Sequence, residues 1–161
     1  MYRVAIVEPA PGRLRALLGD FLLALDDSPA VQITCGTGFA DFSGVYDLFV
    51  VGALIETSPL PADLSCRVLL LPGDGQTVAS QIPSKWAVSF GLSSKDSITL
   101  SSLTRDSALL SLQRELVTLD GFVIEQQEIP IVIPRATSAP GLMAFYGSLL
   151  LLGVSPKELT V

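Results

Sequence analysis

The first half of the chain alternates short apolar runs with stretches that are rich in turn residues. Several of these runs are apolar at every position, which is typical of strands covered on both faces in a parallel sheet. The pattern therefore predicts a central, mainly parallel sheet of about five strands. The predicted strands span residues 3–7, 31–35, 46–51, 67–71 and 87–90.

Between the first two runs, apolar residues recur at the spacing of an amphipathic helix. Pro11 lies near the start of this helix, and the polar residues 26–29 follow its end. A strand, a helix and a returning strand form a βαβ unit, which makes the two strands parallel. The later crossovers are short, and only residues 76–82 predict another helix. The apolar positions of the first helix are Leu14, Leu17, Leu18, Phe21, Leu22 and Leu25.

After Gly91 the pattern changes, because apolar residues now alternate with mostly polar ones. This alternation predicts an antiparallel meander with one face exposed, built from residues 98–100, 108–112 and 117–119. Asp120-Gly121 is a strong hairpin signal between two apolar segments. Pro130 cannot donate to a ladder, so the strand at residues 129–133 is expected at an edge or a bulge.

Residues 142–154 are strongly apolar, but they supply only about half of the roughly 20 residues that a membrane-spanning helix needs. We interpret them as a buried helix that ends at Gly153. Residues 155–158 then form a capping box with Pro156 at the first helical position. One turn is too short to be stable alone. We interpret it as the start of a helix that is missing, for which a lost downstream domain is one explanation.

Together these patterns predict one α/β domain over residues 1–161. Its parts are a Rossmann-like parallel region at residues 1–91, a small antiparallel meander at 92–134, and a buried C-terminal helix with a stub at 135–161. The length is consistent with a single hydrophobic core.

The composition narrows the classes of partner. Charged residues make up only 16% of the chain and hydrophobic residues 49%, whereas typical soluble domains are about 25% charged. This balance predicts an apolar surface covered by a partner, and we expect a homodimer. Ten basic residues stand against 16 acidic ones, with no basic run, so nucleic acid is not expected as a ligand.

Cysteine and histidine usage excludes several kinds of site. The chain has no histidine, and Cys35 and Cys66 are far apart, so the sequence predicts neither a zinc cluster nor a disulfide framework. Both cysteines are expected to be small core side chains. The N-terminus enters a strand pattern without the features of a signal peptide. We therefore expect a bacterial, cytoplasmic protein with no membrane association.

Ligands of open parallel sheets bind beyond the carboxyl ends of the strands. In this sequence those positions are small or rich in glycine, although glycine also simply makes tight turns after strands. Gly36-Thr37-Gly38 has no third glycine and no helical pattern after it, so it fails as a dinucleotide fingerprint. The candidate ligand-binding residues are Glu8, Gly12, Arg13, Thr37, Asp74 and Ser93.

Three further groups invite a chemical interpretation. Asp74 could hold magnesium or a ribose, but Pro-Gly-Asp-Gly is also ordinary turn chemistry. Residues 93–96 contain serines, a lysine and an aspartate, yet nothing requires the lysine to be buried, and an exposed loop is the preferred interpretation. Glu125 and Glu128 could form an acid–base pair, but beside an edge strand they are expected to be solvated. No catalytic residue, metal or cofactor is predicted.

The order of segments resembles the central ATP-binding domain of the Mur ligases, the ATP-dependent amino-acid ligases of peptidoglycan synthesis. In that family a first strand runs into a phosphate loop, T-G-T-x-G-K-T or -S, and a long helix. Here residues 4–7 run into Glu8-Pro9-Ala10-Pro11-Gly12-Arg13-Leu14 and a long helix. Residues 67–74 are similar to the family's strand before an Asn-x-Asp-Asp turn. Residues 87–92 resemble V-x-T-F-G, and residues 151–158 resemble L-G-V/I-x-x-E.

The departures from this pattern imply that an inherited ATPase would be inactive. Only Gly12 remains of the phosphate loop, and Arg13 stands where the family has lysine. Pro9 and Pro11 each remove an N–H donor, and Leu14 cannot coordinate a metal. The family's carbamylated lysine and C-terminal domain have no counterpart. The resemblance implies a degenerate relative without an intact phosphate loop and a partner in cell-envelope metabolism.

We therefore expect a non-catalytic binding or interaction module. Two alternatives stay open. One is a small enzyme with a site at the carboxyl ends of the parallel strands, although no nucleophile is paired with a base in the sequence. The other is a subunit of a larger assembly, which the high apolarity and low charge would suit.

Overall fold

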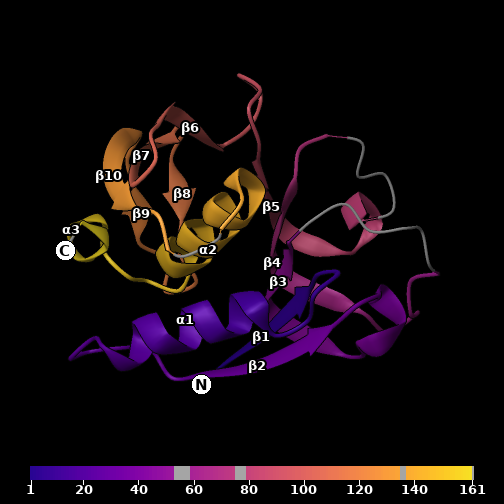
Figure 1. Cartoon of the computed structure of the whole chain (residues 1–161). Coiled ribbons are helices and arrows are strands. Elements are labelled where there is room, and N and C mark those ends of the chain that lie inside the picture. Colours follow the sequence, from indigo (N-terminus) through magenta and orange to yellow (C-terminus); the bar gives the residue numbers. More distant parts are fainter. Residues whose placement is uncertain (53–58, 75–78, 135–136, 161) are drawn as a thin grey trace.

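The computed structural model describes residues 1–52, 59–74, 79–134 and 137–160. Within these residues, eight strands form one mixed sheet in the order β10-β7-β6-β5-β4-β3-β1-β2 (Figure 1). The first five strands are parallel to one another, as predicted. They are β1 (Tyr2–Val7), β2 (Val31–Gly36), β3 (Val45–Val51), β4 (Ser65–Pro72) and β5 (Ser84–Phe90).

The meander differs from the prediction, because its long strands continue the main sheet. β6 (Ile98–Leu103) joins β5 through one parallel pair, Phe90 with Ile98. β7 (Ser107–Leu112) and β10 (Gln127–Val132) then add antiparallel neighbours. The pairing changes from parallel to antiparallel at β6, the first strand after Gly91, which is parallel to β5 and antiparallel to β7. The sheet extends across this point because Ser97 N–H donates to the Ser89 carbonyl, and Gly91 N–H donates to the Ile98 carbonyl.

The predicted hairpin at Asp120-Gly121 is confirmed. β8 (Leu116–Val117) pairs with β9 (Val123–Ile124) in a separate two-stranded sheet. Gly121 has a φ of 90°, which favours glycine in this turn. The predicted strand at residues 117–119 ends at Val117, because the chain turns there. β10 is the last strand of the large sheet, so Pro130 lies in an edge strand as expected.

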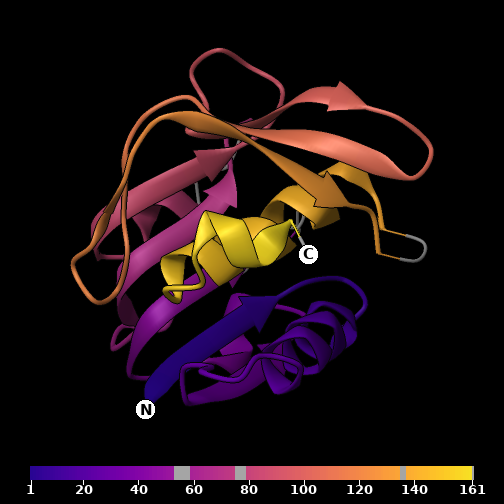
Figure 2. The same ribbon diagram turned by 90° about the vertical axis from the view of Figure 1, so that its left-hand side faces the viewer.

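Two helices cover one face of the sheet, and the sheet curls around the second of them (Figure 2). α1 (Arg13–Leu23) buries Leu14, Leu18 and Leu22 on the predicted apolar side. α2 (Ala139–Leu151) is buried at every position from Leu142 onward. The predicted buried helix at residues 142–154 therefore exists, but it begins three residues earlier. The main hydrophobic core lies between these helices and the sheet.

A smaller core covers the opposite face. Phe39, Phe42, Tyr46 and Phe49 pack their rings against one another there. A 3-10 turn, η1 (Phe39–Asp41), supplies the first of these rings. Of the predicted helix at residues 76–82, the described part forms only a second 3-10 turn, η2 (Ala79–Gln81), and residues 76–78 lie outside the described residues.

The capping box near the C-terminus starts a single turn, α3 (Pro156–Leu159). Ser155 N–H and Oγ–H both donate to Glu158 Oε1, at 3.0 and 3.1 Å. Leu159 is buried in the main core. Tertiary packing therefore stabilises this turn, which local helix propensity alone could not do. None of the helices in the described residues is both long enough and apolar enough to cross a membrane.

Candidate functional site

A pocket of about 260 Å³ opens at the carboxyl ends of β1 and β3. In the sheet, β1 lies between β2 and β3, so the strand order reverses between β1 and β3. Open α/β sheets bind their ligands at such a point, because the connections leave the two strands in opposite directions and open a crevice. The polar and glycine residues that line it are Glu8, Arg13, Gly52, Thr137, Ser138 and Gly141.

The Glu8 side chain turns back onto the helix that follows it. Glu8 Oε1 accepts a hydrogen bond of 3.0 Å from the backbone N–H of Leu14, in the first turn of α1. Gly52 makes room for this arrangement, since a Cβ there would lie 3.3 Å from both Glu8 Cβ and Oε2. Gly12, at the N-cap, has a φ of 93° and no side chain to cap the helix. A carboxylate of the chain itself therefore fills the helix N-terminus.

The opposite wall of this pocket is the beginning of α2. Ser138 is its N-cap and accepts a hydrogen bond of 3.2 Å from Gly141 N–H. Arg13 is exposed at the start of α1 and lines the same pocket. Apolar surface comes from Leu17 and Ala144. The pocket thus joins one cation, one carboxylate and two helix N-termini with apolar walls, which suits binding of a small polar ligand.

Thr37 lies apart from this pocket. The loop after β2 is closed by Asp41, whose Oδ2 accepts hydrogen bonds from Thr37 N–H at 3.0 Å and Gly38 N–H at 3.2 Å. A Cβ at Gly36 would lie 2.8 Å from Asp41 Cβ, so glycine is needed for the close approach. Gly36 and Gly38 were expected to be turn residues. Gly38 lies in the loop before η1, whereas Gly36 is the last residue of β2.

Asp74 and Ser93 line a second pocket, of about 580 Å³, at the carboxyl ends of β4 and β5. Both residues are exposed. The carboxylate beside them is Asp96, which is only 5% exposed. The expectation that residues 93–96 form an exposed loop is therefore wrong at Asp96, because Gly73 and Gly91 leave space for its side chain. No local sequence signal marked this burial, because Gly73 and Gly91 follow two different strands, β4 and β5.

The other chemical interpretations gain no geometric support. Ser93 Oγ accepts a hydrogen bond from the backbone N–H of Lys95, and the Lys95 side chain is exposed. Glu125 and Glu128 are both exposed, as expected. Among the described residues, no three Cys, Asp or Glu side chains gather in a way that could hold a metal ion.

The cysteines occupy different environments. Cys66 is buried in the smaller core, and burial raises the pKa of its thiol to about 12. Cys35 is half-buried against the main core, where burial is the largest cause that raises its pKa. Thiolates are the reactive form of cysteine, so Cys66 is chemically inert near neutral pH. The interpretation as core side chains is confirmed for Cys66, and Cys35 packs at the margin.

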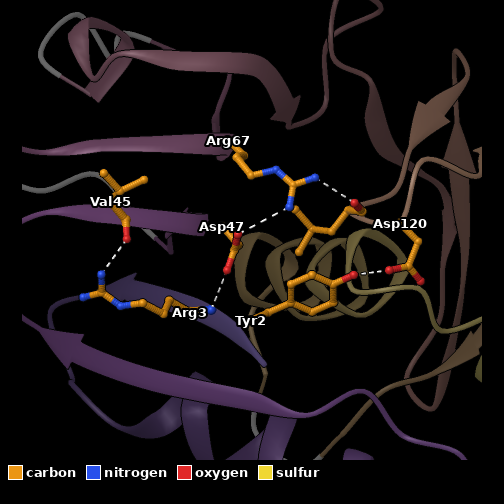
Figure 3. A network of polar contacts seen from close by, with 7 residues as sticks. Tyr2, Arg3, Val45, Asp47, Arg67 and Asp120 are labelled. Atoms are coloured by element: carbon orange, nitrogen blue, oxygen red, sulfur yellow. Dashed lines mark hydrogen bonds and ion pairs between the residues drawn. The ribbon is translucent and has the colours of Figure 1, made fainter.

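A polar network joins the amino-terminal parts of β1, β3 and β4 to the β8–β9 hairpin (Figure 3). Asp47 accepts a hydrogen bond from Arg3 N–H at 2.8 Å and pairs with Arg67 at 3.4 Å. Arg67 also donates to the carbonyl of Leu119, at 2.8 Å. Tyr2 donates to Asp120 in the β8–β9 hairpin. These contacts fasten the hairpin to the amino ends of the strands, so the network is structural.

No model of a known protein family matches the chain, and neither does any curated protein sequence.

Proposed function

We propose that this chain is a non-catalytic binding or interaction module, related in plan to the central domain of the Mur ligases, with its ligand site in the pocket between β1 and β3. The observation that carries the proposal is the hydrogen bond from Leu14 N–H to Glu8 Oε1. In a phosphate loop, that helix N-terminus would receive a phosphate group. Here a carboxylate of the chain takes the same position, while the rest of the pocket stays open.

The Glu8 contact argues against nucleotide binding at this pocket. A triphosphate would have to displace Glu8 from Leu14 N–H or lie beside its negative charge. Pro9 and Pro11 supply no N–H donors to replace that bond. Each hydrogen bond to a charged group that is lost costs about 1.5 to 3 kcal/mol, so two or three losses lower the affinity by several orders of magnitude.

The same proposal includes a Rossmann-like origin, a homodimer and a cytoplasmic location. The parallel strand order β5-β4-β3-β1-β2 supports the first of these. The low content of charged residues supports self-association. Exposed apolar side chains, such as Leu23 and Phe122 at 87% and 71% exposure, support it as well. A protein partner in cell-envelope metabolism follows from the Mur ligase plan.

Titration calorimetry with millimolar Mg-ATP tests the binding mode. We expect no saturable heat from the unmodified protein, because the phosphate position is filled by Glu8. Saturable binding that Arg13→Ala abolishes would overturn the proposal. Arg15→Ala is the matched control, since Arg15 is an exposed arginine on the same helix that does not line the pocket.

A further inference from the structure

The second pocket, between the ends of β4 and β5 and the start of α2, contains an unusual carboxylate. Asp96 is 5% exposed and lines this pocket. Buried carboxylates are normally paired with a cation or fully hydrogen-bonded, because desolvation of the charge is costly. Neither lysine nor arginine is among the described residues that line the pocket.

The carboxylate is held in a fixed position. Asp96 Oδ2 accepts a hydrogen bond of 3.1 Å from Ser93 N–H. Gln113 Nε2 donates to the carbonyl oxygens of Ser93 and Asp96, at 3.0 and 2.7 Å, and so clamps the loop onto β7. A Cβ at Gly73 or Gly91 would overlap the Asp96 carboxylate, so the two glycines form a cradle for it. Such preorganisation lowers the conformational entropy that the site itself loses when a ligand binds.

One oxygen of this carboxylate is available. Among the described residues, Asp96 Oδ1 accepts no hydrogen bond, whereas Oδ2 accepts that of Ser93. The remaining walls are apolar and come from Phe90, Leu92 and Met143. Asp74 adds a second carboxylate at the exposed rim. A hydrogen-bond donor with positive charge would satisfy Oδ1, and an apolar group attached to it would cover the walls.

We propose that this pocket binds a small organic cation, a primary ammonium or guanidinium group on an apolar body. The cationic group lies against Asp96 Oδ1, and the apolar body lies along Phe90 and Met143. The site is separate from the pocket between β1 and β3, with the first turn of α2 between them. The two proposals therefore succeed or fail independently.

The test compares 2-phenylethylammonium with neutral 2-phenylethanol and anionic 3-phenylpropionate, which have similar apolar bodies. Amide chemical shifts of ¹⁵N-labelled protein are followed at near-neutral pH and low salt. We expect saturable shifts at Gly73, Gly91 and Met143, with the cation bound at least about tenfold more tightly than the alcohol. Equal affinity for cation and alcohol, or saturable shifts confined to other residues, would overturn the proposal.

Asp96→Asn is the decisive variant, because asparagine keeps an oxygen for Ser93 N–H and removes the charge. We expect Asp96→Asn to bind the cation and the alcohol with about equal affinity. Asp106→Asn is the control, since it makes the same charge change in the exposed β6–β7 turn. An unchanged preference in Asp96→Asn would contradict the proposal. If that variant does not fold, Ala139→Trp is used instead, because a tryptophan at this position would fill the pocket from the start of α2. Chemical shift changes at Gly73 and Gly91 that persist in Ala139→Trp would also contradict the proposal.

Discussion

At the scale of single residues, carboxylates of the chain itself fill the loops at the carboxyl edge of the sheet. Glu8, Asp41 and Asp96 each follow a parallel strand and accept a hydrogen bond from a nearby backbone N–H. Gly52, Gly36 and Gly91 provide the space for them, in the same order. In phosphate-binding proteins, such backbone N–H groups donate to a bound anion. Here carboxylates of the chain accept these hydrogen bonds, so we expect a ligand other than a nucleotide.

The buried thiol of Cys66 should make the stability of the protein depend on pH. Burial raises the pKa of its thiol to about 12 from 9.0, so the thiol ionises more easily in the unfolded chain. Its contribution to stability is complete below about pH 9 and is lost as the pH rises toward 12. Between pH 9 and 12, the free energy of unfolding should decrease with pH in both proteins. The decrease should be steeper in the unmodified protein than in Cys66→Val, by up to about 1.4 kcal/mol per pH unit.

Urea unfolding at several pH values from 8 upward measures this difference. Cys66→Val is needed as a reference, because burial also raises the pKa values of Cys35 and Tyr146. These two groups lower the free energy of unfolding at high pH in both proteins, so their effect cancels in the comparison. Parallel pH profiles for the native protein and Cys66→Val would show that the buried thiol does not contribute.

At the scale of elements, α2 lies so close to the sheet that a side chain at Gly147 would require its neighbours to shift. A Cβ at Gly147 would lie 2.9 Å from Ile98 Cδ1 and 3.3 Å from Leu70 Cδ2. Gly19 in α1 has nothing within 4 Å of a Cβ. The two helices therefore use glycine for different reasons, although both glycines stand in the interior of an apolar helical pattern.

Substitution of each glycine by valine tests whether close packing explains the glycine in α2 but not the one in α1. Gly147→Val should lower the free energy of unfolding by about 1 to 3 kcal/mol, because the larger side chain overpacks the contact with β6 and β4. Gly19→Val should change it by less than about 0.5 kcal/mol, since valine and glycine differ little in helix propensity. Urea denaturation gives both values, and equal effects would contradict close packing of α2 as the cause.

At the scale of the whole molecule, the sheet has two halves with different surfaces. The parallel half is covered by α1 and α2 on one face and by the aromatic core on the other. The antiparallel half is covered on one face by α2 and α3. Alternate residues of β10, such as Val132 at 56% exposure, face outward. Outward apolar side chains favour contact with another chain.

We therefore expect a homodimer at micromolar concentration. Light scattering after gel filtration should give twice the 17.0 kDa mass of one chain. Phe122→Lys, at an exposed position of the β8–β9 hairpin, should leave the fold intact because its side chain is 71% exposed. Because this exposed apolar side chain supports self-association, the variant should shift the measured mass toward that of one chain. A mass of 17.0 kDa for the unmodified protein would contradict self-association.

Local patterns in the sequence determined the five parallel strands, α1, the buried part of α2, the hairpin at Gly121 and the edge position of Pro130. Each depends on interactions between near neighbours, namely side-chain periodicity, turn conformation or a missing N–H donor, and these can be read from adjacent residues. The candidates Glu8 and Arg13 were found in the same way, because they follow the first strand, and the structure brings both to one pocket.

Tertiary structure decided the features that join distant residues. The Phe90–Ile98 pair, which carries the sheet into the meander, depends on how the loop between them folds. The burial of Asp96 depends on Gly73 and Gly91, at the ends of two different strands, and on Gln113 in a third segment. The pocket beside Glu8 needs the start of α2, more than 120 residues later in the chain. Such contacts form only when the whole core packs, so no local pattern contains them.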